Sequence, residues 1–133
     1  MTLYQSFRKY IKKRNIQEVD GSTDGTSVFI RYNELFYAFL YDTDDPYYFR
    51  LVLPRIADYN EIQEADINKF ALEKSGEYKI CKLVVIDNNI WASFEQIILN
   101  PDAENDYIYD AALRILSSIQ RTLRDYINSK HTT

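Results

Sequence analysis

The chain has 133 residues, of which 46% are hydrophobic and 27% charged, and its net charge at pH 7 is −4. This length and apolar content predict a single domain over residues 1–133 with its own core, and they exclude intrinsic disorder and collagen-like order. The acidic net charge argues against nucleic-acid binding, because neutralising phosphates requires a broad positive surface.

A first helix is predicted near the start, where Leu3, Phe7, Tyr10 and Ile11 fall on one helical face. Residues 1–17 carry five bases and no acid. These bases form either a solvated helix face or a positive surface for an acidic partner. They are Arg8, Lys9, Lys12, Lys13 and Arg14.

Three strands are predicted next, over Ser27–Tyr32, Leu35–Tyr41 and Tyr47–Leu53, because these runs are rich in aromatic and β-branched residues. The short connections between them favour an antiparallel meander. Pro54 is expected to end the third strand, since proline cannot donate a hydrogen bond to a neighbouring strand.

The second half of the chain predicts two helices and two strands. A helix is expected between Asn60 and Ser75, strands over Lys79–Ile86 and Ile90–Leu99, and a last helix of about 25 residues from Pro101. The resulting order α-β-β-β-α-β-β-α predicts an α+β fold, a five-stranded antiparallel sheet with helices packed on it. Residues 128–133 are expected to form a flexible tail.

Residues that could carry chemistry are few. His131 is the only histidine and lies at the end of the chain, which argues against catalytic pairs and metal sites that need histidine. Cys81, the only cysteine, lies among apolar residues, and we expect its thiol to be buried. A single cysteine that cannot form an intramolecular disulfide indicates a reducing compartment, for which we predict the cytoplasm. The carboxylates of Asp87 and Glu95 do not specify a reaction. We see no pattern of a signal peptide or a membrane span.

The acidic segment Asp42–Asp45 begins like a calcium-binding loop. An EF-hand would require glycine where Tyr47 stands and glutamate where Leu53 stands, so the motif fails at both positions. We therefore expect a solvated hairpin turn. From these observations we predict that the protein is not an enzyme and has no cofactor or metal site.

Aromatic residues are concentrated on the three strands of the meander, and both strand faces carry them. They form either core and cross-strand packing or a surface for a dimer mate or a bound polypeptide. The candidate partner-binding residues are Tyr37, Tyr41, Tyr47 and Trp91. The last helix has a broad apolar face, and Leu116 and Leu123 are its candidates for self-association.

The segment from Ile67 to Phe70, followed by the strand-turn-strand of Lys82 to Glu95, resembles the YbjN family and the wider group with the type III secretion chaperone-like fold. The resemblance implies a domain of three helices and five strands, often dimeric, that binds protein and is not a catalyst. It implies no particular functional residue.

The sequence therefore predicts a non-enzymatic protein-binding domain, chaperone- or adaptor-like, that forms a homodimer. One alternative is an enzyme or small-ligand binder that uses the Asp42–Asp45 turn, Glu95 or Cys81. A second alternative is a nucleic-acid-associated regulator that uses the bases between Arg8 and Arg14. The sequence leaves open which face of the sheet the helices cover.

Overall fold

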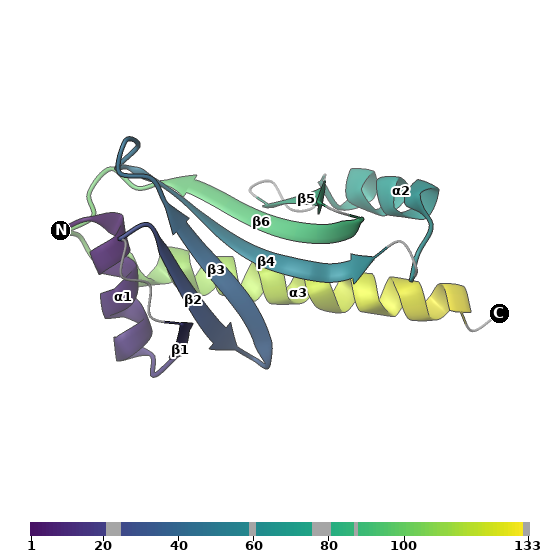
Figure 1. Cartoon of the computed structure of the whole chain (residues 1–133), viewed down its shortest axis with the longest axis horizontal. Coiled ribbons are helices and arrows are strands. Elements are labelled where there is room, and N and C mark those ends of the chain that lie inside the picture. Colours follow the sequence, from purple (N-terminus) through teal and green to yellow (C-terminus); the bar gives the residue numbers. More distant parts are fainter. Residues whose placement is uncertain (21–24, 59–60, 76–80, 87, 132–133) are drawn as a thin grey trace.

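The computed structural model describes residues 1–20, 25–58, 61–75, 81–86 and 88–131. Six strands form one antiparallel sheet in the order β1-β2-β3-β4-β6-β5 (Figure 1). The elements are α1 (Leu3–Lys13), β1 (Gln17–Asp20), β2 (Ser27–Tyr32), β3 (Leu35–Tyr41), β4 (Tyr48–Asp58), α2 (Glu64–Ser75), β5 (Cys81–Ile86), β6 (Asn89–Ile97) and α3 (Asp106–His131).

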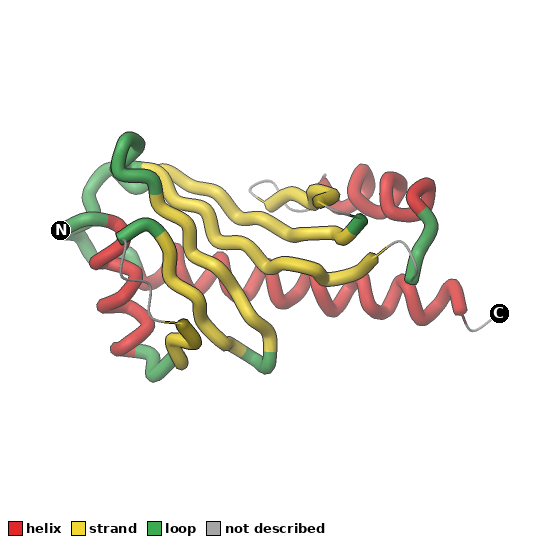
Figure 2. Tube along the Cα trace, in the orientation of Figure 1, coloured by secondary structure: helices red, strands yellow, loops and turns green. Residues whose placement is uncertain are grey.

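Helices α1 and α3 cover one face of the sheet. The strands form a single curved layer, and α3 runs behind it along most of its length (Figure 2). α1 begins with a capping box, in which the Thr2 side chain accepts a hydrogen bond from the Gln5 N–H and the Gln5 side chain accepts one from Thr2. The apolar face of α1 then packs against the sheet beside α3.

An aromatic cluster joins the sheet to both helices. Phe39 of β3 stacks on Phe7 of α1, with ring centroids 4.2 Å apart, and on Phe49 of β4 at 5.5 Å. Tyr109 of α3 meets Phe7 and Phe49 edge-on, with centroids at 5.3 and 5.5 Å. All four side chains are fully buried. This cluster fixes which strand face points to the helices.

The α+β class and the antiparallel sheet are confirmed, but the sheet has six strands where the sequence predicted five. The additional strand is β1, which pairs with β2 at one edge of the sheet and contains a register shift between Glu18 and Asp20. It is short and largely exposed. Such an edge strand lacks the apolar alternation that identifies buried strands in a sequence.

Pro54 does not end the third strand of the meander, contrary to our expectation. β4 continues to Asp58, and its register against β6 shifts between Leu53 and Ala57. Pairing of β4 with β3 stops at Val52, so the missing N–H of Pro54 costs no hydrogen bond on that side.

The last helix begins later and ends later than predicted. Asn105 donates side-chain hydrogen bonds to the carbonyls of Asn100 and Ala103, which fixes a turn before α3 begins at Asp106. At the other end, α3 continues through His131. Residues 128–131 of the expected tail are therefore helical.

Candidate functional site

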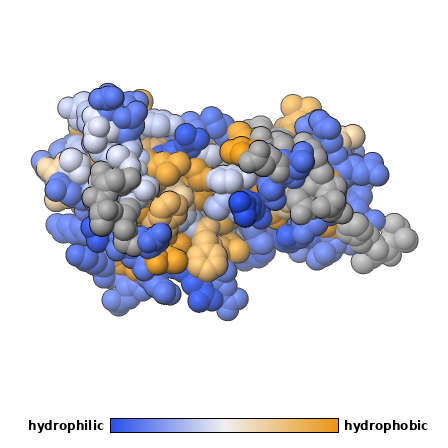
Figure 3. Space-filling view, in the orientation of Figure 1, coloured by the Kyte–Doolittle hydropathy of each residue, from blue (hydrophilic) through white to orange (hydrophobic). Residues whose placement is uncertain are grey.

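The face of the sheet opposite α1 and α3 is the candidate site, and we call it the open face. The strand register places Phe29, Ala38, Val52 and Ser93 in one row across β2, β3, β4 and β6. Because side chains alternate along a strand, this row points away from the Phe39 cluster. Figure 3 shows apolar side chains gathered over β2, β3 and β4 on this face.

The open face has a floor of small side chains bordered by large exposed ones. Ala38, Val52 and Ser93 are buried within the row. Phe29 is 41% exposed and Phe36, on the neighbouring row, is 56% exposed. Ile97, toward the end of β6, is 62% exposed. A shallow apolar surface with aromatic edges is typical of a protein-binding site.

Two polar atoms on the same side of β6 lack hydrogen-bond partners. Trp91 Nε1 and Ser93 Oγ are both buried and unpaired among the described residues. Both residues alternate with the core residues Ala92 and Phe94, which places them on the open face. Unpaired buried polar atoms are uncommon in folded proteins, so β6 has unmet hydrogen-bonding capacity here.

A charged cluster borders the apolar part of the open face. Glu95 Oε1 lies 3.0 Å from Lys82 Nζ and 3.9 Å from Arg50 Nε. Burial by itself raises the pKa of Glu95, but hydrogen bonds from Lys82 and Tyr48 and the charges of Lys82 and Arg50 together outweigh this effect, so the pKa lies below its usual value. Glu95 is thus held as a carboxylate, which does not suit a general acid.

The structure removes Tyr37 and Tyr41 from the predicted partner surface. Both belong to the core, and Tyr37 is only 1% exposed. Its hydroxyl shares a hydrogen bond with Ser117 of α3, and burial raises its pKa to about 12. These two tyrosines have the same strand parity as Phe39 and therefore point to the helices. Tyr47 is half-exposed and Trp91 partly buried, so these two remain accessible candidates.

The structure also removes Leu116 and Leu123 from the predicted self-association surface. Leu116 is 0% and Leu123 1% exposed, and both contribute to the core beneath the sheet. The broad apolar face of α3 is needed to cover a six-stranded sheet, which explains its width. Leu72 on α2 is by contrast 79% exposed.

Sequence reasoning missed Phe29, Phe36 and Ile97 as surface residues. The sequence contains a signal that could have separated them from the core. Arg31 and Arg50 share the parity of the open face, and a charged side chain at such a position indicates contact with water.

Among the residues that the structure describes, the groups considered for catalysis or metal binding do not come together in one site. The Asp42–Asp45 turn is a hairpin turn, in which the Asp42 side chain accepts a hydrogen bond from the Asp44 N–H at 2.9 Å. Burial raises the pKa of Cys81 to about 12, so its thiol is protonated at neutral pH. Asp87 lies outside the described residues. Within the described ranges there is no cluster of three metal-ligating side chains and no helix long and apolar enough to cross a membrane.

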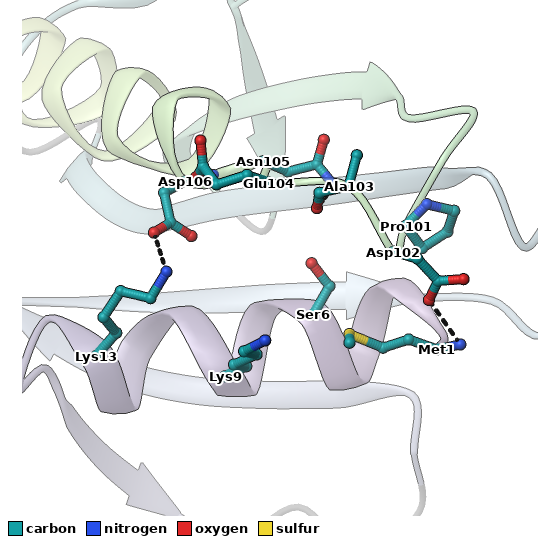
Figure 4. Close-up of a pocket in the computed structure, with 10 residues that line it drawn as sticks. All are labelled: Met1, Ser6, Lys9, Lys13, Pro101, Asp102, Ala103, Glu104, Asn105 and Asp106. Carbon is teal, nitrogen blue, oxygen red and sulfur yellow. Dashed lines mark hydrogen bonds and ion pairs between the residues drawn. The ribbon is translucent and has the colours of Figure 1, made fainter.

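A small polar cavity of about 150 Å³ lies between α1 and the segment leading into α3 (Figure 4). Opposite charges pair across it, with the Met1 amino group 3.0 Å from Asp102 and Lys13 Nζ 2.7 Å from Asp106. These two ion pairs neutralise the Met1 amino group and Lys13 within the molecule.

The basic residues of α1 are largely used within the molecule. Arg8 lies 3.2 Å from Glu18, and Arg14 lies 3.0 Å from Asp110, in addition to the Lys13–Asp106 pair. These acids neutralise three of the five bases of the segment. The remaining charge does not form the broad positive surface that nucleic-acid binding requires.

Asp110 gives the contact between α1 and α3 a predictable pH dependence. Arg14 donates hydrogen bonds to its carboxylate and Tyr10 donates another, so the pKa of Asp110 lies below its ordinary value. A carboxylate whose pKa is lower in the folded state stabilises the fold at pH values above its unfolded pKa of about 3.9. This stabilisation is lost as the pH falls through the folded-state pKa. Because the Asp110 side chain is 41% exposed and water screens its charge, Asp110→Asn should lower the free energy of unfolding at pH 7 by only about 0.5 kcal/mol.

Urea unfolding of the wild type and Asp110→Asn at pH 7 and pH 3 measures this. The difference between the two proteins should shrink at pH 3. Asp125→Asn is the matched control, because Asp125 is exposed on the same helix. A difference that stays constant with pH would show that the Asp110 carboxylate does not stabilise this contact.

Comparison with known proteins identifies the fold. The Yersinia pestis type III secretion chaperone SycH, solved in complex with a stable fragment of YscM2, superposes on 92% of this chain and on 99% of its own chain. The TM-score is 0.64 at 10% sequence identity. No protein-family model and no curated protein sequence matches the chain. The chain thus has the fold of a type III secretion chaperone, while the YbjN resemblance remains a prediction.

Proposed function

We propose that this chain is a non-enzymatic protein-binding domain of the chaperone or adaptor kind, and that its open face binds a segment of a partner protein. The observation that carries the proposal is the open face itself, where large apolar side chains are exposed around a floor of small ones. The SycH structure, which contains a bound protein fragment, supports a protein partner for this fold.

The chemistry of the open face suits a polypeptide better than a metabolite. Its apolar area is shallow and spread over four strands, whereas small ligands are usually enclosed in deep clefts. Phe29 and Phe36 offer rigid contact area, and binding by such side chains carries a modest entropic cost. We also propose that the protein works in the cytoplasm as a homodimer, joined through residues other than Leu116 and Leu123.

A displayed library of random short peptides tests this function. The wild-type chain should enrich peptides rich in apolar residues. The double variant Phe29→Ser, Ile97→Ser should bind them at least about tenfold more weakly, since each exposed apolar side chain contributes roughly 1 kcal/mol. The control is Leu72→Ser, Tyr107→Ser, which changes two exposed apolar residues on helices.

The control variant should retain wild-type affinity, and both variants should keep the wild-type unfolding curve because the changed side chains are exposed. Failure to enrich any peptide would contradict the proposal. Equal loss of affinity in both double variants would also contradict it, because the binding would then not depend on the open face.

A further inference from the structure

The sheet contains an opening between β3 and β4, which we call the notch. β3 pairs with β2 from Leu35 to Leu40, but it pairs with β4 only over Ala38–Tyr41. β4 continues beside β6 to Asp58. The two strands therefore diverge after Val52, as Figure 1 shows, and each has a stretch without a neighbouring strand on the side facing the notch.

The backbone of β4 keeps the notch open. Pro54 has no N–H to donate. Arg55 has a φ of 55°, in the left-handed region that residues other than glycine rarely adopt. The register shift against β6 spans the same residues. Bulges and strained residues of this kind are concentrated at functional sites in proteins.

The notch has an apolar interior and room for a side chain. Its cavity volume is about 380 Å³, within the range of roughly 300–1,000 Å³ that is typical of small ligand sites. Leu53 and Ile56 are buried in its walls, and Phe36 stands at its rim. Arg124 of α3 lines it as well, held by Glu61 at 3.1 Å.

The rim carries positive charge in a chain whose net charge is −4. Arg55 lines the notch, and Arg31 lies over the Phe36 ring with 5.9 Å to the centroid. Among the described residues, neither arginine has an ion-pair partner. The notch is also lined by one acidic residue, Glu34. Two arginines beside an apolar cavity are complementary to a carboxylate next to an apolar side chain.

We propose that the notch binds one large apolar side chain of an extended partner segment, and that Arg31 and Arg55 bind an acidic residue adjacent to it in the partner. This inference rests on the proposed function, because it names the chemistry of the segment that the open face binds. The unpaired stretches of β3 and β4 offer backbone hydrogen bonds to an extended chain, which adds affinity that does not depend on sequence.

Two displayed peptide libraries test the inference. Both contain an apolar residue at a fixed position, which is followed by Asp or Glu in one library and by Lys or Arg in the other. The wild-type chain should enrich binders from the acidic library. The double variant Arg31→Gln, Arg55→Gly should bind those peptides about tenfold more weakly, and added salt should reduce the wild-type preference.

Glycine is chosen at position 55 because it adopts a positive φ without strain, so the variant is expected to keep its fold. Arg121→Gln is the matched control, since Arg121 is an exposed arginine on α3. It should bind the acidic peptides as the wild type does.

Two results would overturn the inference and leave the proposed function standing. One is equal enrichment from both libraries, and the other is unchanged affinity in Arg31→Gln, Arg55→Gly, in either case with binding still lost in Phe29→Ser, Ile97→Ser. Enrichment from neither library would remove both proposals, because the open face would then bind no extended peptide.

Discussion

Replacing Phe39 with alanine is expected to lower the free energy of unfolding by about 3 to 5 kcal/mol. Phe39 is 0% exposed, and its ring lies between Phe7 of α1 and Phe49 of β4 at the centre of the aromatic cluster. The substitution removes apolar burial and ring stacking, and it leaves a cavity that the surrounding strands cannot close. Urea unfolding followed by far-UV circular dichroism measures the loss.

Phe36→Ala is the matched control for this prediction. Phe36 is the same residue type on the same strand, but it points to the open face, where its side chain is largely exposed. Its replacement should change the unfolding free energy by less than about 0.5 kcal/mol. Similar losses of unfolding free energy in Phe39→Ala and Phe36→Ala would contradict the assignment of Phe39 to the buried face of β3 and Phe36 to its exposed face.

Leu116→Ala is expected to cost about 2 to 5 kcal/mol of unfolding free energy. Leu116 is fully buried between α3 and the sheet, so its contribution is made within one chain. Leu72→Ala removes the same atoms from an exposed position on α2 and should stay within about 0.5 kcal/mol of the wild type.

Light scattering on the folded proteins separates the two possible roles of Leu116. The volume-conserving variant Leu116→Met should keep both the fold and the molecular mass of the wild type. If Leu116 instead formed a contact between subunits, its substitution would change the molecular mass in solution, and the free energy of unfolding of each chain would change little. That result would contradict the assignment of Leu116 to the core.

Local sequence patterns predicted most of the elements because their causes are local. The hairpin between β2 and β3 follows from Asn33 and Glu34, which both adopt a positive φ as tight two-residue turns require. Asn88 does the same between β5 and β6. β1 and the passage of β4 through Pro54 depend instead on neighbouring strands, so no short window of sequence could show them.

The site was harder to predict than the fold. Phe36 and Tyr37 are adjacent aromatic residues that point to opposite faces of β3, and their sequence does not say which face α3 covers. The hydrogen bond between Tyr37 and Ser117, which are 80 positions apart in the sequence, shows that α3 covers the face on which Tyr37 lies. The aromatic concentration correctly marked the three strands, but only the tertiary packing separates core tyrosines from surface phenylalanines.

The most direct test of the central claim uses Trp91, the only tryptophan of the chain, which lies on the open face. A peptide enriched by the wild-type protein and free of tryptophan is titrated into it while tryptophan emission and binding heat are recorded. If the open face binds the peptide, the emission should shift to shorter wavelength with the same saturation as the heat. Saturable heat with unchanged emission in the wild type would contradict the claim, because the peptide would then bind elsewhere.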